Sequence, residues 1–264
     1  MAKTQKELAF LRELDINENW TKRFTDLVDK HLKFSDEENL LYINAGTGNH
    51  AIALREKTGD ETAIFATCED EHALAIAHDK AIAVKADVDF SMIRFEDDAF
   101  DAVLTDASFL RADDLSDAIE NSVRVARSGG KVAVMLVAAG SFGEIFSLLW
   151  EVLFNEDLGE HGAAAETVVL ELPTVSRIEE IAESAGLVNL KTFSENEIFE
   201  YENGTEFINS PLVADFLLPA WLQSLNENEK ELVSEKLAQL IDAEDGTLTF
   251  RFTVKAMLLT GEKV

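Results

Sequence analysis

The stretch 40-LLYINAGTGNHAIAL-54 decides how this chain folds. An apolar run meets two glycines, Gly46 and Gly48, and is followed by apolar spacing typical of a helix. A strand, a tight loop and a helix N-terminus in this order suit a nucleotide-like ligand, because glycine lets the backbone approach and the helix start offers free N–H groups. Gly46 to Ala51 also satisfies the G-x-G-x-x-A pattern of dinucleotide-binding loops, although a match this short also occurs in plain turns before helices.

Strand and helix patterns alternate on both sides of this loop. We expect strands at residues 40–45, 62–69, 81–87, 102–105 and 131–139, with helices at 50–59, 70–81 and 115–127 between them. The SGG segment before the last of these strands reads as a turn. This alternation predicts an α/β fold with a parallel sheet and helices on both faces.

The flanking segments are less regular. Two short helices are expected within residues 4–34, further helices at 144–154, 174–186, 204–225 and 227–244, and strands at 187–193 and 248–261. Residues 167–173 read as a short strand or an extended connection. We expect one domain, 1–264, made of N-terminal helices at 1–36, a cofactor-binding core at 38–140, helical additions at 141–172 and 196–247, and a final strand at 248–264.

Composition narrows the class of partner. The chain has 23 basic against 51 acidic residues, a net charge of -28, which disfavours nucleic acid and anionic membranes and suits a small molecule. The N-terminus shows no secretory signal and no apolar run reaches membrane-spanning length, so a cytoplasmic protein is expected. The single cysteine, Cys68, and five scattered histidines predict no disulfide and no metal site.

Acidic residues follow two of the expected strands. Glu69 ends the second strand, where a carboxylate can accept hydrogen bonds from both ribose hydroxyls. Asp87 ends the third expected strand, where a carboxylate can accept from an exocyclic amine such as that of adenine. With the glycine loop, three consecutive strand ends thus carry groups suited to one adenosine.

A second pattern lies further along the chain. An acidic turn leads into Phe100-Asp101-Ala102-Val103, and Arg124-Val125 is followed by Gly129-Gly130 before the fifth strand. This combination resembles the class I S-adenosylmethionine-dependent methyltransferases, especially the UbiE-like group that acts on small molecules. The resemblance covers residues 38–137 and, more loosely, 177–193 and 250–261. It implies a Rossmann-like methyltransferase fold, with a mostly parallel seven-stranded sheet, helices on both faces and an added helical cap.

The resemblance also implies the cofactor, S-adenosyl-L-methionine, with S-adenosyl-L-homocysteine as product. The loop would pass under the methionine and ribose parts, Glu69 would hold the ribose, and Asp70, Asp87 and the Val88 backbone would lie near the adenine. Asp106 and Ala107 would line the methionine end and the mouth for the acceptor. The full set of implied cofactor residues is Asn44, Ala45, Gly46, Thr47, Gly48, Glu69, Asp70, Asp87, Val88, Asp106 and Ala107.

Two residues depart from the family pattern. Tyr42 stands where the family often has an acid that helps to hold the cofactor's ammonium group, and Asn44 stands where it often has glycine. Asparagine adopts a left-handed backbone more readily than most residues, so the turn is expected to survive. The leading hypothesis is a methyltransferase for a small, partly apolar acceptor. The alternative is a methyltransferase-like binding or scaffold protein without turnover, and a nicotinamide oxidoreductase ranks third.

The catalytic residues stay open. His50, in the first turn of the expected helix, suits either a base or a simple helix-start residue, and we name no base. The helical additions carry many large apolar residues, which suit ordinary core packing, a lid over the acceptor closed by Trp20 and Phe24, or a homodimer surface. These residues are Phe142, Phe146, Trp150, Phe154, Phe207, Phe216, Leu217 and Trp221.

Overall fold

The computed structural model describes residues 3–34, 38–59, 61–244 and 249–264. The segment boundaries expected at residues 36 and 247 lie outside these ranges. The chain divides into two compact units. The first comprises residues 1–136, 174–195 and 256–264, and the second comprises 137–173 and 196–255. Each unit is described by itself.

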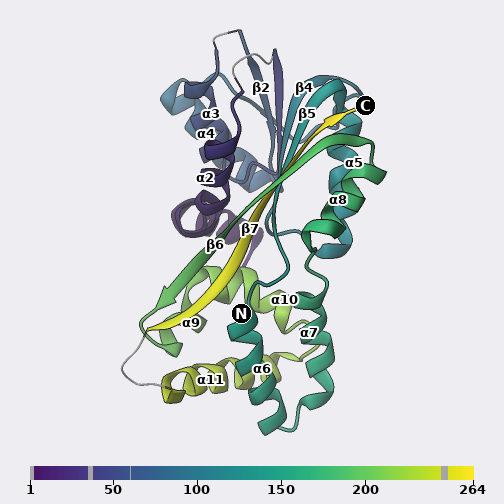
Figure 1. Ribbon diagram of the computed structural model, residues 1–264. Coiled ribbons are helices and arrows are strands. Elements are labelled where there is room, and N and C mark those ends of the chain that lie inside the picture. Colours follow the sequence, from purple (N-terminus) through teal and green to yellow (C-terminus); the bar gives the residue numbers. More distant parts are fainter. Residues whose placement is uncertain (1–2, 35–37, 60, 245–248) are drawn as a thin grey trace. The chain divides into compact units, whose positions relative to one another are not determined.

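The first unit is built on a sheet whose strand order is β3-β2-β1-β4-β5-β7-β6. Neighbours among β1 to β5 pair in parallel, and β6 and β7 run in opposite directions (Figure 1). This confirms the predicted fold class. The strands are β1 (Asn39–Ile43), β2 (Ala63–Thr67), β3 (Asp89–Ser91), β4 (Phe100–Ala107), β5 (Ala126–Val137), β6 (Leu187–Tyr201) and β7 (Phe250–Lys263).

Helices cover both faces of this sheet. In Figure 1, α2 (Lys22–His31), α3 (Asn49–Lys57) and α4 (Glu71–Val84) lie on one side of it, and α5 (Leu115–Val125) and α8 (Val175–Ser184) lie on the other. The central strands are therefore buried on both faces, as their unbroken apolar runs require. Leu40 to Tyr42 and Ala102 to Thr105 are each at most 1% exposed.

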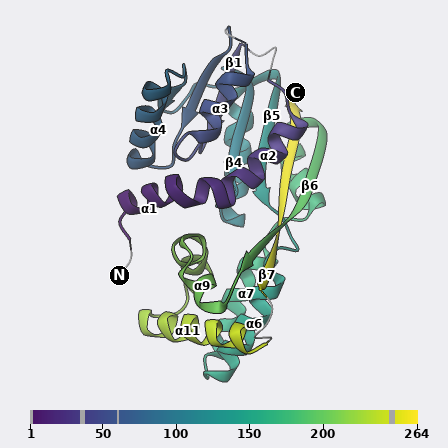
Figure 2. The same ribbon diagram turned by 90° about the vertical axis from the view of Figure 1, so that its left-hand side faces the viewer.

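The N-terminal helices form one continuous segment rather than two separate helices. A wide π-helical stretch, Arg12–Thr21, joins α1 (Gln5–Leu11) directly to α2. Figure 2 shows this segment running along one edge of the sheet. Extended π-helix is rare and often found at functional sites.

Three sequence predictions are wrong. Residues 81–84 belong to α4 rather than to a strand, because Ala73, Ala77 and Ala81 continue one buried helical stripe until Lys85 turns left-handed at φ 58°. Residues 167–170 lie in α7 (Gly162–Leu170), where the preceding alanines favour helix over the three β-branched residues that follow them. The SGG segment is part of β5 rather than a turn. The register of the pairing between β4 and β5 shifts at this segment.

The second unit contains both segments expected as helical additions. It holds α6 (Gly143–Asn155), α7, α9 (Gly204–Asn209), the π-helical stretch Leu212–Leu217, α10 (Leu218–Trp221) and α11 (Glu227–Glu244), with the adjoining parts of β6 and β7. Its core is aromatic. Trp221 packs edge-on against Phe142 and Phe146, and Phe199 stacks on Phe252 with ring centroids 4.9 Å apart.

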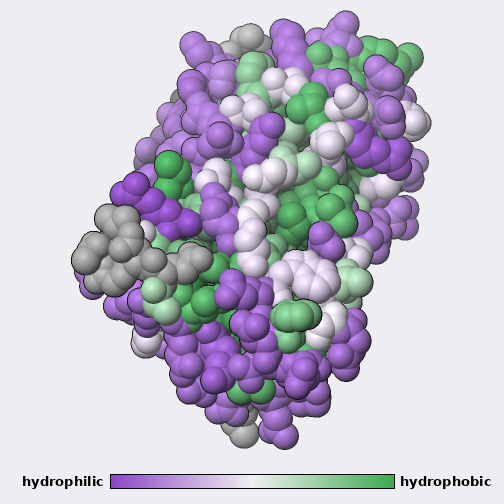
Figure 3. Space-filling view, turned by 60° about the horizontal axis from the view of Figure 1, so that its bottom comes forward, coloured by the Kyte–Doolittle hydropathy of each residue, from purple (hydrophilic) through white to green (hydrophobic). Residues whose placement is uncertain are grey.

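The surface is mostly hydrophilic on the face drawn in Figure 3, as the excess of acidic residues requires. Within the described residues, no helix has the length and hydropathy needed to cross a membrane. The single-domain organisation and the homodimer stay predictions.

Candidate functional site

The glycine loop follows β1 and opens α3, as predicted. Gly46 and Gly48 are both left-handed, with φ 59° and 84°. They serve different purposes. A Cβ on Gly46 would meet no atom within 4 Å, whereas one on Gly48 would lie 2.7 Å from the ring of Phe90 and 2.9 Å from Ala77. Gly48 therefore lets α4 and β3 pack closely, and the open space for a ligand lies beside Gly46.

The two departures from the family pattern are accommodated in different ways. Asn44 is left-handed, with φ 59°, and its Nδ2 donates to the carbonyl of Asp106 at 3.2 Å. Its side chain is thus used to join β1 to β4. Tyr42 is 1% exposed, and its hydroxyl lies 3.4 Å from Nδ1 of His50. Burial, aided by nearby acids, raises the pKa of Tyr42 well above its usual value, so it stays a neutral phenol.

The end of β2 presents Glu69 at the same edge of the sheet. Its Oε1 accepts from the Arg12 guanidinium at 3.2 Å, and among the described residues Oε2 has no partner. Asp70, beside it, uses Oδ1 to cap α4 by accepting from the N–H groups of His72 and Ala73. Burial raises the pKa of Cys68 to about 12, so this thiol is unreactive at neutral pH.

The end of β4 contributes Asp106 and Ala107. Oδ1 of Asp106 accepts from the N–H of Ser108 at 2.8 Å. Burial raises the pKa of Asp106 to about 6, with Glu69 adding to the effect, while the Ser108 hydrogen bond and Arg12 oppose it. A cation placed near this carboxyl would favour its charged form. Asn44, Glu69 and Asp106 therefore gather at one edge, as predicted.

Asp87 and Val88 do not belong to this edge. β3 begins at Asp89, so both residues precede the strand instead of ending it. Because β3 pairs in parallel with β2, with Ser91 opposite Thr67, the residue at the carboxyl end is Ser91. Its Oγ is buried and, within the described residues, has no hydrogen-bond partner. The basis for assigning Asp87 and Val88 to adenine is lost.

Besides Ser91, the structure brings the N-terminal segment to this edge, where Arg12, Glu13 and Asn17 were not predicted. Arg12 reaches Glu69, Glu13 and Asn17 reach Thr47, and Trp20 donates from Nε1 to Oγ of Ser108 at 3.0 Å. The segment is thus attached to the ends of β1, β2 and β4. Trp20 and Phe24 are fully buried and form part of the core rather than an exposed lid. The four-residue spacing of Glu13 and Asn17 was the only sequence signal for a shared polar face.

His50 is part of a buried chain of polar groups. Its Nε2 lies 3.3 Å from Oδ1 of Asp29, and Asp29 also pairs with Lys57. Burial works to raise the pKa of Asp29, but hydrogen bonds from His50 and Lys57 outweigh it and lower the pKa to about 2. His50 thus links α2, α3 and β1, which favours its structural reading.

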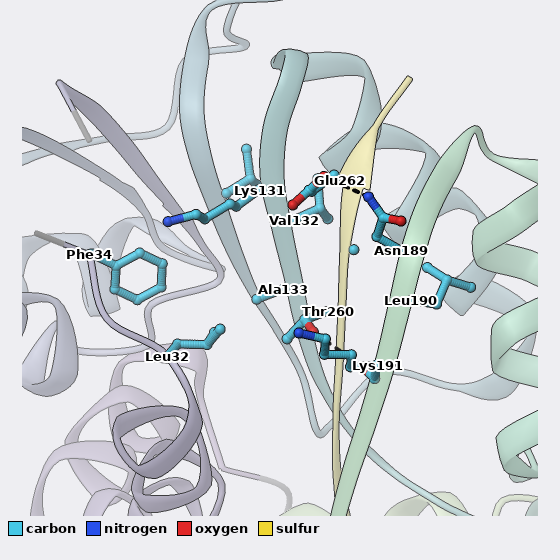
Figure 4. Close-up of a pocket in the computed structure, with 12 residues that line it drawn as sticks. Leu32, Phe34, Lys131, Val132, Ala133, Asn189, Leu190, Lys191, Thr260 and Glu262 are labelled. Atoms are coloured by element: carbon cyan, nitrogen blue, oxygen red, sulfur yellow. Dashed lines mark hydrogen bonds between the residues drawn. The ribbon is translucent and has the colours of Figure 1, made fainter. Parts of the chain in front are cut away.

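A second hollow of about 500 Å³ opens on the sheet face among β5, β6 and β7 (Figure 4). Leu32 and Phe34 border it, and Lys131 and Lys191 lie at its rim (Figure 4). Its wall at Val103 lies four residues before the end of β4, so about 13 Å separates it from the cofactor edge. It is too far away to hold a group that reacts there.

Comparison with known proteins finds a family match for part of this chain. Residues 41–134 match the family described as "Methyltransferase domain". A search of curated proteins found no match. The matched range includes the glycine loop and the downstream pattern, and over this range the predicted resemblance to methyltransferases is confirmed.

Solved structures share the fold at low identity. The YcgJ protein of Bacillus subtilis superposes with a TM-score of 0.59 at 14% identity, covering 92% of this chain and 98% of its own. Phosphoethanolamine N-methyltransferase 2 of Haemonchus contortus, solved with S-adenosylhomocysteine, has a TM-score of 0.55 at 17% identity, covering 98% of this chain and 58% of its own. The [4+2]-cyclase SpnF has a TM-score of 0.53 at 18% identity, and the match covers 100% of this chain and 98% of its own.

The cofactor of this family is S-adenosyl-L-methionine, and the residues present fit it. The cofactor carries a sulfonium and an ammonium cation, and the edge offers the carboxyl groups of Glu69 and Asp106 within an acidic protein. Open space lies beside Gly46, and the buried Oγ of Ser91 lacks a partner within the described residues. Within these residues no group of His, Cys, Asp and Glu is arranged to hold a metal ion.

Proposed function

We propose that this protein transfers the methyl group of S-adenosylmethionine to a small, partly apolar acceptor. The observation that carries the proposal is the convergence of three strand ends, at Gly46, Glu69 and Asp106, on one edge of a methyltransferase domain. When bound there, the cofactor supplies an electrophilic methyl group and leaves as S-adenosylhomocysteine.

The chain's own residues account for binding and orientation. The free Oε2 of Glu69 suits the ribose hydroxyls, and the hydrogen bond from Arg12 fixes the direction of its carboxylate. Ser91 replaces Asp87 as the polar group proposed near the adenine. Methyl transfer depends above all on alignment of the two reactants, and no base is needed unless the acceptor must lose a proton.

For the acceptor, the proposal names a chemical class and not a compound. The aromatic residues of the second unit supported both a core and a lid reading, and most of them now have core partners within that unit. Trp221 is 3% exposed and packs against Phe142 and Phe146, which favours the core over the lid for this residue. Phe154 and Leu170 of the same unit are more than 70% exposed and support the homodimer alternative.

The alternative is a binding or scaffold protein without turnover. The fold itself is compatible with chemistry other than methyl transfer, since the [4+2]-cyclase SpnF shares it. Calorimetry with S-adenosylmethionine and NAD tests binding, and mass spectrometry of S-adenosylhomocysteine formed with candidate acceptors tests turnover. Tight binding of S-adenosylmethionine without any turnover would favour the alternative. Preferential binding of NAD would reject both.

A matched pair of variants tests the site itself. Glu69→Gln should weaken S-adenosylhomocysteine binding by about 1.5–3 kcal/mol, the scale of charge-assisted hydrogen bonds. Glu71→Gln is the control. The side chain of Glu71, two positions further along the chain, is 82% exposed, so this substitution should leave affinity unchanged. Equal affinities for the two folded variants would reject the role given to Glu69.

A further inference from the structure

The N-terminal segment brings a carboxylate to the glycine loop. Oε2 of Glu13 accepts from the hydroxyl of Thr47 at 2.5 Å and from Nζ of Lys80 at 2.7 Å. Asn17 donates from Nδ2 to both Glu13, at 3.1 Å, and Thr47, at 2.7 Å. Thr47 is fully buried, so these bonds hold Glu13 against a fixed part of the loop.

Only one oxygen of this carboxylate is used. All three hydrogen bonds to Glu13 end on Oε2, and Oε1 has no partner among the described residues. The side chain is 26% exposed. A carboxylate held by one oxygen, with the other directed at no protein group, is ready to accept from a ligand cation.

The other acids of the edge are less suited to that task. Glu69, which like Glu13 pairs with one basic side chain, is already proposed to hold the ribose. Asp106 accepts from the N–H of Ser108 through one oxygen, and its burial opposes ionisation. Tyr42, the last residue but one of β1, stays a neutral phenol beside His50. Of these groups, Glu13 alone combines an unused oxygen with direct contact to the loop.

We infer that Glu13 binds the ammonium group of the cofactor's methionine part, and so supplies from the N-terminal segment the carboxylate that β1 lacks. This rests on the proposed function. It also gives the segment a role, because cofactor binding then draws on residues 12–17 as well as on the sheet. The pairing with Lys80 keeps Glu13 in place before the ligand arrives.

The experiment uses ligands that differ only in the ammonium group. S-adenosylhomocysteine and its deaminated counterpart, in which a ketone replaces the amino group, are titrated by calorimetry into the full-length protein and into Glu13→Gln. The variant should lose about tenfold or more in affinity for S-adenosylhomocysteine, the scale of a charge-assisted hydrogen bond, and little for the ketone. Glu18→Gln is the matched control, because Glu18 lies on the same stretch, is 73% exposed and pairs with Lys22.

The outcomes separate the two proposals. If the parent protein binds neither S-adenosylmethionine nor S-adenosylhomocysteine, the proposed function fails. If the parent binds them but Glu13→Gln loses the same factor for both test ligands, Glu13 only supports the loop, and the inference is overturned. Unchanged affinity for S-adenosylhomocysteine in the folded variant overturns it as well. Thermal melting of each variant establishes that it is folded.

Discussion

At the scale of single residues, the two glycines of the loop show how one motif meets two needs. Gly48 is required by packing, since any side chain there would overlap Phe90, while Gly46 faces open space. Asn44 and Tyr42 show that residues which depart from the expected loop pattern can be accommodated by hydrogen bonds of their own. Asn44 ties β1 to β4, and Tyr42 ties β1 to α3 through His50.

Asn44 affects stability through its left-handed backbone and through the hydrogen bond of its side chain, and two substitutions can separate these contributions. Asn44→Ala should lose about 1–2 kcal/mol of unfolding free energy, because alanine is strained at φ 59° and cannot donate to Asp106. Asn44→Gly should lose less, because glycine adopts this backbone freely. Urea unfolding measures both values. A larger loss for glycine than for alanine would show that backbone strain at this position is negligible.

The carboxyl of Asp106 should make stability depend on pH. Its pKa is raised to about 6 in the fold, so its favourable contribution is complete below the unfolded pKa of about 3.8 and is lost as pH rises to about 6. Asp106→Asn removes this dependence on pH. The difference in unfolding free energy between the variant and the parent should therefore move in favour of the variant by about 1–3 kcal/mol between pH 4.5 and 7.5.

Urea unfolding of the parent and Asp106→Asn at both pH values measures this shift. For Asp101→Asn, the pH dependence of the effect on stability should have the opposite sign. Burial of Asp101 works to raise its pKa, but the N–H of Asn39 and the guanidinium of Arg127 outweigh it and lower the pKa. A pH-independent effect of Asp106→Asn would contradict the raised pKa.

At the scale of elements, the polar chain of Asp29, His50 and Tyr42 joins α2, α3 and β1. Every link is side chain to side chain, from Lys57 and His50 to Asp29 and from His50 to the buried phenol. Such a chain fixes how the helix that follows the glycine loop sits on the sheet. It therefore supports the loop without touching a ligand.

Removing the acid of this chain should destabilise the first unit in a pH-dependent way. The pKa of Asp29 is lowered to about 2, so its contribution is present above the unfolded pKa of about 3.8 and is lost as pH falls towards 2. Asp29→Asn should cost about 1–2 kcal/mol at pH 7, allowing for partial exposure, and clearly less at pH 3. Chemical denaturation at the two pH values checks this, and an equal cost at both would point to lost packing instead.

The elements also show what the sequence could predict. The order of strands and helices around the loop followed from local patterns, because each of those segments has a clear period. The error at residues 81–84 arose where alanine and β-branched residues alternate, since helix propensity and strand propensity conflict there. Because of that error, Asp87 was predicted at the end of the third strand, whereas it precedes β3. Contacts from residues 12–20 to the strand ends depend on how distant segments pack, which no local pattern records.

At the scale of the whole molecule, charge is the dominant feature. With 51 acidic and 23 basic residues, most carboxylates have no basic partner to pair with, and the folded chain brings them closer together than the unfolded chain does. The resulting repulsion opposes folding. The same field favours a cationic cofactor over anionic ligands, which agrees with the chemistry proposed for the sheet edge.

Salt should therefore stabilise this protein. Screening shortens the range of repulsion from about 10 Å at 0.1 M to about 3 Å at 1 M ionic strength, so Tm at pH 7.5 should rise by several degrees between 0.1 and 1 M KCl. The sequence pI of about 4.4 provides the control, because repulsion vanishes near that pH. The same salt step at pH 4.5 should produce little change, as scanning calorimetry can show. A comparable rise at both pH values would mean that salt acts through burial of apolar surface rather than through charge.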